Sequence, residues 1–240
     1  MVGANLISKQ RCEAAVLEIA ESAPLQAHIL IQIMRDDGFS SAVIGSVKDD
    51  LDGRAIHHGA SFLAASAPFL NVSLVRFREK HSVDLERFVS WLKQSPLFPE
   101  PRLKLVREGL AAWFAEDWLK AIRVLVPQIE AAIRDLLAKL GGSVMRPDRH
   151  HGGFQAIGLG DAVRDELFRA KVPEAMRFHL QVLLHDPRGI NLRNSLAHGF
   201  AARELFDRGL GNWMVHLVLM LGVLRLGPEG KPAGDTKPAI

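Results

Sequence analysis

The sequence predicts a mainly α-helical protein. Apolar residues recur at helical spacing along most of the chain, and proline or glycine interrupts these segments where helices commonly end. Of its 240 residues, 48% are hydrophobic and 24% are charged, which provides a sizeable core and excludes a disordered chain. The single cysteine, Cys12, excludes an internal disulfide and a cysteine zinc cluster, and its apolar helical face predicts a small core residue.

Residues 1–100 are expected to form a mostly helical N-terminal region. The first helix is predicted over residues 9–22, because apolar residues follow helical spacing there and Pro24 ends the pattern. Two runs rich in β-branched residues then flank an Asp37-Gly38 turn and predict a β-hairpin at about 28–47. A buried helix is the alternative for the same runs.

A polar turn is predicted over residues 48–54, which carry three carboxylates. A calcium loop would also require a distal glutamate, which is absent here. His57 and His58 follow, but adjacent side chains point apart on a helix or strand, so no metal site is predicted. Helical spacing continues from 61 to 91, and three prolines within 94–101 mark the expected boundary with a second region.

Residues 101–226 are expected to form an antiparallel helical bundle. Glu116-Asp117 is an N-terminal signal for a helix over 118–140, which Pro127 should bend or split. The glycine-rich basic segment 143–160 is interpreted as a mobile loop. The remaining helices are expected at 103–114, 159–170, 173–184 and 213–226, with a short helix through Arg203 to Phe206 before the last of these.

The most apolar run, 213–226, predicts a buried helix. Its 14 residues include His216 and Arg225, so the run is too short and too polar to span a bilayer. A basic-then-apolar signal segment is also missing at the N-terminus, and we therefore expect a cytoplasmic protein that does not contact the membrane. The net charge of +3 is compatible with a nucleic-acid partner. The tail 227–240, with three prolines and three glycines, is predicted to be disordered.

The stretch from Asp186 to Gly199 contains the residues most suited to chemistry. Proline and glycine at 187–189 end any preceding helix, Asn191 can act as an N-cap, and residues 192–197 open a new helix. At about 100° per residue, Asn194 and His198 share one face of that helix.

Arg193 lies about 140° from His198 around the same helix, so the two side chains can flank one groove. A guanidinium fork holds phosphate oxygens, and an imidazole exchanges protons near neutral pH. This pair therefore suits a phosphate group. The structural alternative is that Arg193 pairs with a neighbouring carboxylate and His198 caps a helix end.

These residues resemble a known motif. The run from Arg193 to His198 is similar to the R-polar-x3-H motif of the HEPN superfamily, and residues 186–199 resemble a bacterial family of unknown function whose members end in a similar LRN, two residues, AHG segment. Residues 117–134 resemble the helix that precedes the motif in those proteins, and Asp52-Gly53-Arg54 is a third similarity. The likeness covers roughly residues 105–226.

The resemblance implies a HEPN-like bundle and metal-independent endoribonuclease activity on single-stranded RNA, in a defence, toxin or RNA-processing role. It requires neither a metal nor a cofactor. The expected partners are RNA, a second copy facing this one through the motif helices, and an antitoxin or other defence-system protein. The expected catalytic residues are Arg193, Asn194 and His198, and the expected substrate-binding residues are Arg188, Asn191 and Arg203.

Two other functions fit the same residues. A HEPN-like bundle can bind RNA or a nucleotide without cleaving it, and a helical dimeric scaffold can use Arg193 and His198 structurally. Cleavage that resists EDTA would identify the nuclease, RNA retention weakened by salt would identify the binding protein, and loss of thermal stability alone in His198→Ala would identify the scaffold.

Overall fold

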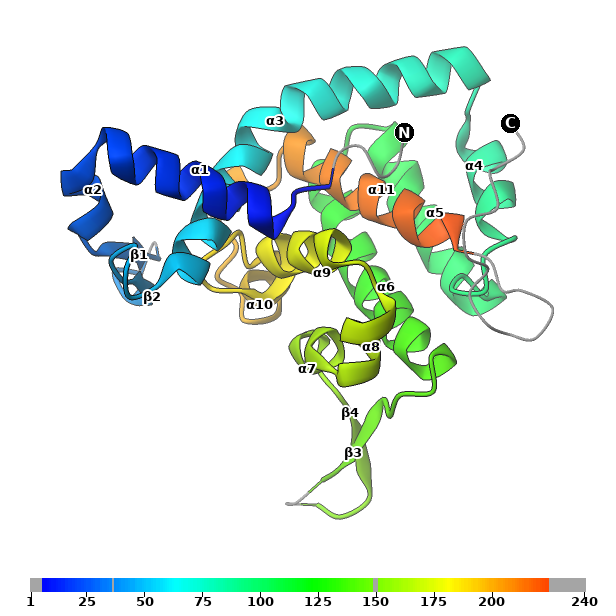
Figure 1. The fold of residues 1–240 in the computed structure, drawn as a ribbon. Coiled ribbons are helices and arrows are strands. Elements are labelled where there is room, and N and C mark those ends of the chain that lie inside the picture. Colours follow the sequence, from blue (N-terminus) through cyan, green and yellow to red (C-terminus); the bar gives the residue numbers. More distant parts are fainter. Residues whose placement is uncertain (1–5, 36, 149–150, 225–240) are drawn as a thin grey trace. The chain divides into compact units, whose positions relative to one another are not determined.

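The computed structural model describes residues 6–35, 37–148 and 151–224 (Figure 1). Within them the protein is mainly helical, as the sequence predicts, and its strands form two short antiparallel hairpins. The predicted disordered tail, 227–240, lies outside the described residues. The described residues divide into two compact units: unit 1 comprises residues 6–68 together with 172–205, and unit 2 comprises residues 69–171 together with 206–224.

This division differs from the regions expected at 1–100 and 101–226, because the proline-rich segment 94–101 is not a linker. Leu97 and Phe98 are buried in unit 2, where the Ser95 hydroxyl donates to the Leu221 carbonyl at 3.1 Å. Pro101 lies in the first turn of a helix, where its missing N–H would have no partner in any case. The prolines therefore begin a packed helix.

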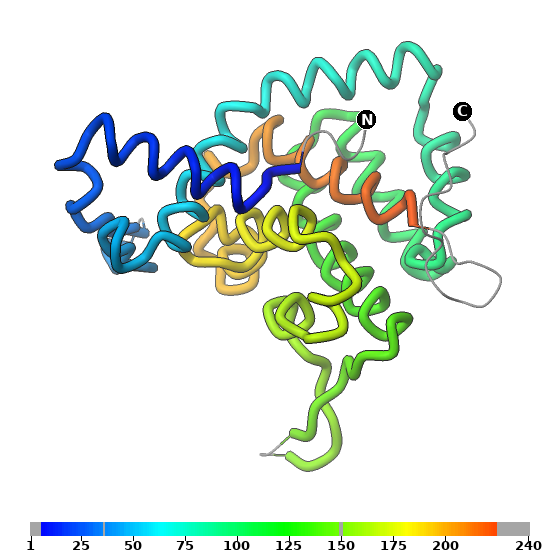
Figure 2. Tube along the Cα trace, viewed as in Figure 1, coloured from blue at the N-terminus to red at the C-terminus, as the bar shows by residue number. Residues whose placement is uncertain are grey.

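Unit 1 contains the start of the longest helix and the motif. Figure 2 follows the chain from its first helices through a hairpin into that long helix. The elements are α1 (Lys9–Ser22), α2 (Pro24–His28), β1 (Ile31–Met34), β2 (Ser40–Ile44), the first part of α3 (Leu51–His81), α9 (Glu174–Leu180), a π-helical turn η2 (Gln181–His185), α10 (Leu192–Ala197) and a 3-10 turn η3 (Arg203–Leu205).

The predicted β-hairpin is confirmed. β1 pairs with β2 from Ile31 opposite Ile44 to Met34 opposite Ser40, and the turn between them closes with an Arg35 N–H donating to the Phe39 carbonyl at 2.9 Å. Gly38 takes a φ of 82° in this turn, a left-handed conformation that favours glycine. Cys12 on α1 is buried, as predicted, and burial raises the pKa of its thiol.

A buried arginine connects the hairpin to α3. Arg54 is 8% exposed, and its Nε donates to the Gly45 carbonyl and its Nη1 to the Gln26 carbonyl, both at 2.8 Å. Its Nη2 also donates to the Ile29 carbonyl. The predicted polar turn over residues 48–54 is therefore shorter than expected: α3 begins at Leu51, and the Asp50 carboxylate accepts the Gly53 N–H at 2.8 Å.

Unit 2 is built around two buried helices, α6 and α11. The predicted N-terminal signal is confirmed, because the Asp117 carboxylate accepts the Lys120 N–H at 3.0 Å. The elements are the end of α3, α4 (Leu85–Leu92), α5 (Glu100–Phe114), α6 (Trp118–Lys139), β3 (Met145–Pro147), β4 (Phe154–Ala156), α7 (Leu159–Arg164), α8 (Glu166–Lys171) and α11 (Arg208–Val223).

Most of the apolar run expected to be buried at 213–226 lies in α11, whose residues from Leu210 to Gly222 are all buried. Val223 is 45% exposed, and residues 225–226 lie outside the described residues. The adjoining helices α5 and α6 approach closely at Gly109, where a Cβ atom would lie 2.6 Å from Leu125. The helix expected over 118–140 is confirmed as α6, which continues through Pro127, so of the two expected effects of this proline, a bend or a split, the split does not occur. Proline has no N–H, so one hydrogen bond of the helix is missing at Pro127. Burial of one long face of α6 compensates for this loss.

Two other features differ from expectation. The segment 143–160, expected to be a loop, carries the β3–β4 hairpin, with Met145 opposite Ala156. α3 is the one helix in the described part of the chain that is long and apolar enough to cross a membrane, and 17% of its apolar window is buried. This statement refers to the length and composition of α3 only, and core helices of soluble proteins can have the same length and composition.

Candidate functional site

All six predicted site residues lie in unit 1, in the segment that runs from the end of α9 through η3. Helix α9 ends in the π-helical turn η2. Gly189 then approaches this turn so closely that a Cβ atom added to the glycine would lie 2.4 Å from the Val182 carbonyl oxygen. The Ile190 N–H donates to that same oxygen at 2.8 Å. Glycine is therefore required to fold the chain back before the motif helix.

Arg188, expected to contact RNA, is held by three carboxylates. Its Nε donates to Asp186 at 3.0 Å, its Nη1 to Asp50 at 3.2 Å and its Nη2 to Asp52 at 2.9 Å. Lys9 of α1 also pairs with Asp52 at 2.7 Å. These groups connect three distant segments of unit 1, so the arginine anchors the loop that carries the motif.

Electrostatics strengthens this anchor. Burial alone would raise the pKa of the Asp186 carboxyl, but hydrogen bonds from Arg188 and Gln181 outweigh it and hold the pKa below its ordinary value. The hydrogen bond to Asp186 raises the pKa of the Arg188 guanidinium, which stays charged in any case. The side chain of Asp186 is 9% exposed, so water screens this pair little.

Asn191 precedes α10, but its side chain does not cap the helix as expected. The residue has a φ of 53° and a ψ of 33°, a left-handed conformation, and its side chain makes no hydrogen bond to the helix backbone. Its Oδ1 instead accepts a hydrogen bond from Asn194 Nδ2 at 2.8 Å. Asparagine tolerates this backbone conformation better than most residues.

Asn194 holds its neighbours in place. Its Nδ2 donates both to Asn191 and, at 3.2 Å, to the His185 carbonyl, which connects α10 to the π-helical turn. Its Oδ1 accepts from Arg193 Nη1 at 3.1 Å. Both ends of the amide are therefore engaged within the protein, and one of them orients the arginine.

His198 stands at the C-terminal end of α10, where the chain makes a Schellman turn. Gly199 has a φ of 73°, its N–H points to the Leu196 carbonyl at 3.4 Å, and the Phe200 N–H donates to the Ser195 carbonyl at 2.8 Å. This turn explains why glycine follows the histidine. It also returns Phe200 beside His198, and their rings stack with centroids 5.9 Å apart and planes inclined by 28°.

The three expected catalytic residues differ in exposure. His198 is exposed, whereas Arg193 and Asn194 are partly buried. Arg203, expected to bind substrate, is exposed in η3. Neither Arg193 nor His198 belongs to the buried core, and His198 is the more exposed of the two.

The sequence did not predict that the hairpin would reach the motif. Arg35, which follows β1, places its guanidinium carbon 4.1 Å from the centroid of the Phe200 ring. Phe200 directly follows the motif glycine, and Arg35 directly precedes the predicted hairpin turn. Each was visible in the sequence, but the contact joins segments more than a hundred residues apart, and no local pattern encodes such a contact.

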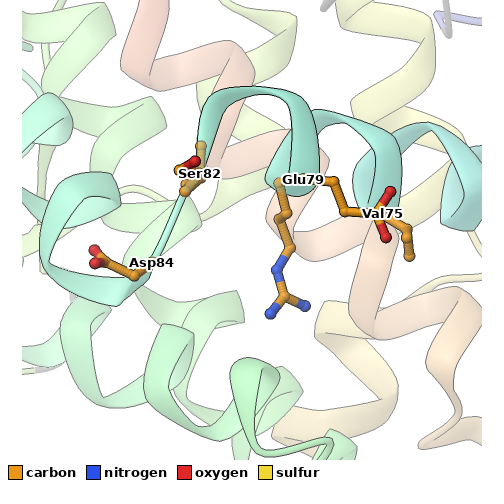
Figure 3. A pocket seen from close by; sticks show the side chains of 6 residues that line it. Val75, Glu79, Ser82 and Asp84 are labelled. Atoms are coloured by element: carbon orange, nitrogen blue, oxygen red, sulfur yellow. The ribbon is translucent and has the colours of Figure 1, made fainter.

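A shallow hollow of about 380 Å³ lies in unit 2, at the turn between α3 and α4 (Figure 3). Figure 3 shows Val75 and Glu79 on the last turns of α3, Ser82 at the turn and Asp84 at the start of α4. Two of its polar groups are already engaged. Asp84 accepts the Arg87 N–H at 2.8 Å, and the Arg78 guanidinium lies 4.5 Å from the Phe114 ring centroid. The hollow therefore has few groups left to bind a ligand.

Among the described residues, no three His, Cys, Asp or Glu side chains converge so that they could hold a metal ion. The carboxylates of Asp50, Asp52 and Asp186 come together only around the Arg188 guanidinium, whose positive charge occupies their centre. The second segment similar to HEPN proteins lies in unit 2, where Glu130 on α6 is buried and pairs with Arg134 at 2.7 Å.

No protein-family model matches the chain, and no curated protein and no solved structure is significantly similar to it. The resemblance to the HEPN superfamily therefore depends on the motif residues.

Proposed function

We propose that this protein is a metal-independent endoribonuclease of the HEPN type that cleaves single-stranded RNA. The observation that carries the proposal is the short helix α10, which presents an exposed imidazole at one end and a guanidinium oriented by an internal amide at the other. RNA supplies its own nucleophile, because the 2′-hydroxyl attacks the adjacent phosphate. The protein must provide a base, an acid and positive charge for the phosphorane.

Each residue receives a distinct role. Arg193 binds the non-bridging phosphate oxygens through its planar fork, and His198 exchanges protons with the 2′-hydroxyl or the leaving 5′-oxygen. Asn194 is a positioning residue, because its amide bonds to Arg193, Asn191 and the His185 carbonyl. Arg188 positions the motif loop through its three carboxylates, and the exposed Arg203 binds the RNA backbone.

The active species in this proposal is a homodimer with two-fold symmetry. One imidazole cannot readily serve as both base and acid in a single concerted step, whereas a second His198 facing the first would supply the missing group. The products are a 2′,3′-cyclic phosphate and a 5′-hydroxyl, because the nucleophile is internal to the substrate. A defence, toxin or RNA-processing role would follow from this activity, and an antitoxin or defence-system protein would restrain it.

The test is incubation of purified protein with single-stranded RNA in EDTA, followed by end-group analysis of the products. His198→Ala and Arg193→Ala should each lower the cleavage rate by about 10²- to 10⁴-fold, the usual contribution of a positioned acid, base or phosphate ligand. The matched controls are His28→Ala and Arg11→Ala, which remove exposed residues of the same types from α2 and α1. Circular dichroism must show that all variants are folded.

Mixtures of wild-type and variant protein test whether the active species is a dimer. In an equal mixture of wild-type and His198→Ala protein, about a quarter of randomly formed dimers contain two wild-type copies. Activity should therefore fall well below half of the wild-type value. Activity that stays at half, or full cleavage by protein that sediments as a monomer, would contradict the composite site. RNA binding without cleavage would favour the non-catalytic alternative.

A further inference from the structure

Two exposed phenylalanines and an arginine lie next to the motif histidine in unit 1. Phe39 is 68% exposed at the hairpin turn, and Phe200 is 47% exposed after α10. The guanidinium carbon of Arg35 lies 4.1 Å from the Phe200 ring centroid and 5.9 Å from that of Phe39. The His198 ring stacks on Phe200. We call Arg35, Phe39, His198 and Phe200 the platform.

The positive charge of the platform is largely compensated. Asp37 accepts hydrogen bonds from Arg35 Nε at 3.1 Å and from Nη2 at 2.6 Å, a bidentate pair. Its Oδ1 also accepts the Phe39 N–H at 3.1 Å, which fixes the turn that carries this ring. The hydrogen bond from Arg35, followed by that from Phe39, lowers the pKa of the Asp37 carboxyl, so the pair stays ionised at neutral pH. Arg35 therefore presents a flat face and little net charge.

Flat faces without net charge suit a nucleobase better than a phosphate. Aromatic rings and guanidinium planes stack on unpaired bases, and every base offers a π-face, so such contacts tolerate any sequence. In a duplex these faces are already covered by neighbouring base pairs. A platform of this kind therefore favours unpaired nucleic acid. Because stacking on a base is not an ionic contact, its contribution to the binding affinity should depend little on salt.

We propose that the platform stacks a nucleobase of single-stranded RNA, mainly on Phe39, the more exposed of its two phenylalanine rings. This inference depends on the proposed function only for the identity of the neighbouring phosphate, which His198 would address. The hairpin then has a role in binding: it positions the nucleotide beside the scissile bond and selects unpaired strands. A second class of occupant, an apolar segment of a protein, is less suited to this surface, because two of its four side chains, Arg35 and His198, are polar.

The experiment measures binding without cleavage. The probe is a fluorescent single strand of about 12 nucleotides, a length within the usual site size, made of 2′-O-methyl RNA so that the 2′-oxygen cannot attack. Anisotropy titrations compare wild type, Phe39→Ala, Phe39→Leu and Phe39→Trp. The matched control is Phe154→Ala, which removes an equally exposed phenylalanine, 72% exposed, from the other hairpin.

We expect Phe39→Ala to weaken binding by about 5- to 100-fold, the range for one stacked base, with an unchanged slope of log affinity against log salt. Phe39→Leu should be weakened nearly as much, Phe39→Trp should bind at least as well as wild type, and Phe154→Ala should be unaffected. Equal affinity of wild type for a duplex probe would overturn the proposal. So would wild-type affinity in Phe39→Ala, or a Phe39→Ala defect confined to self-association in sedimentation.

The same titration separates this inference from the nuclease proposal. If Phe39 is needed to bind the 2′-O-methyl strand but ordinary RNA is never cut, the stacking site stands and the nuclease fails. If ordinary RNA is cut and Phe39→Ala changes neither probe affinity nor KM, the nuclease stands and the stacking site fails.

Discussion

Inside each of the two units, a different kind of interaction joins the segments of the chain. In unit 2 the buried polar groups are mostly neutral pairs, such as Trp113 donating to Asn212 at 2.8 Å, around the apolar helices α6 and α11. In unit 1 the distant segments meet at charged groups, with Arg54 on three carbonyls and Arg188 on three carboxylates. The motif therefore lies in the unit whose geometry depends on directional, charged contacts.

This difference has a functional meaning. Apolar packing is not directional and tolerates small shifts, whereas a forked hydrogen bond fixes both distance and angle. A site that must hold a guanidinium and an imidazole around one phosphate needs the second kind of support. Unit 2 is stabilised mainly by the apolar area that it buries, whereas charged hydrogen bonds fix the positions of side chains in unit 1.

The largest effect is expected in unit 2. Ile129→Ala on α6 removes a fully buried side chain and should lower the free energy of unfolding by about 2–5 kcal/mol, through lost burial and the cavity left behind. All four tryptophans of the chain lie in unit 2, so their fluorescence during urea unfolding reports this change. Leu119→Ala, at a position on the same helix that is 48% exposed, is the control and should change stability by less than about 1 kcal/mol.

The next effect should appear in unit 1. Arg54→Met keeps an unbranched apolar stem but leaves three carbonyls without their donor, and should cost about 2–3 kcal/mol. The measurement is amide hydrogen exchange in α2 and the β1–β2 hairpin, where protection should fall. Arg76→Met, on an exposed position of α3, should leave exchange unchanged. Unchanged protection in Arg54→Met would mean that apolar packing alone holds the hairpin.

A smaller, pH-dependent effect tests the anchor of the motif loop. The folded pKa of Asp186 lies below its ordinary value of 3.8, so its contribution to stability is fully present above that value and is lost as the pH falls through the folded pKa. Asp186→Asn should therefore destabilise the protein by about 1.5–2 kcal/mol at pH near 6, the lower part of the range for a hydrogen bond to a charged group, and by less near pH 3. Urea unfolding at both pH values measures the difference.

The control for the anchor is a similar change in an exposed pair of unit 2. Glu108 pairs with Lys120 at 3.2 Å, with both side chains at least half exposed. Glu108→Gln should change stability by less than about 0.5 kcal/mol, because water and salt screen such a pair. If Glu108→Gln and Asp186→Asn have equal effects, the contrast between the two units is wrong.

The sequence predicted much of the local structure correctly. The mainly helical composition, the β-hairpin, the Asp117 cap, the buried α11 and the breaks around α10 all follow from residues within a few positions of one another. The failures were also local patterns, but ones that tertiary packing overruled. The prolines near residue 100 begin a packed helix, and Pro127 does not split α6, although a split was one of its two expected effects, because α6 is buried along one face.

Sequence by itself determined most of the helices and the first hairpin, and it placed Arg193 and His198 on one short segment. Only the tertiary structure decided what surrounds them. Arg188 meets Asp50 and Asp52 across 138 and 136 residues of chain, and Arg35 meets Phe200 across a similar distance. Helical spacing and capping depend on neighbours a few residues apart, whereas these contacts depend on how whole segments pack, and a pattern read along one chain does not contain that information.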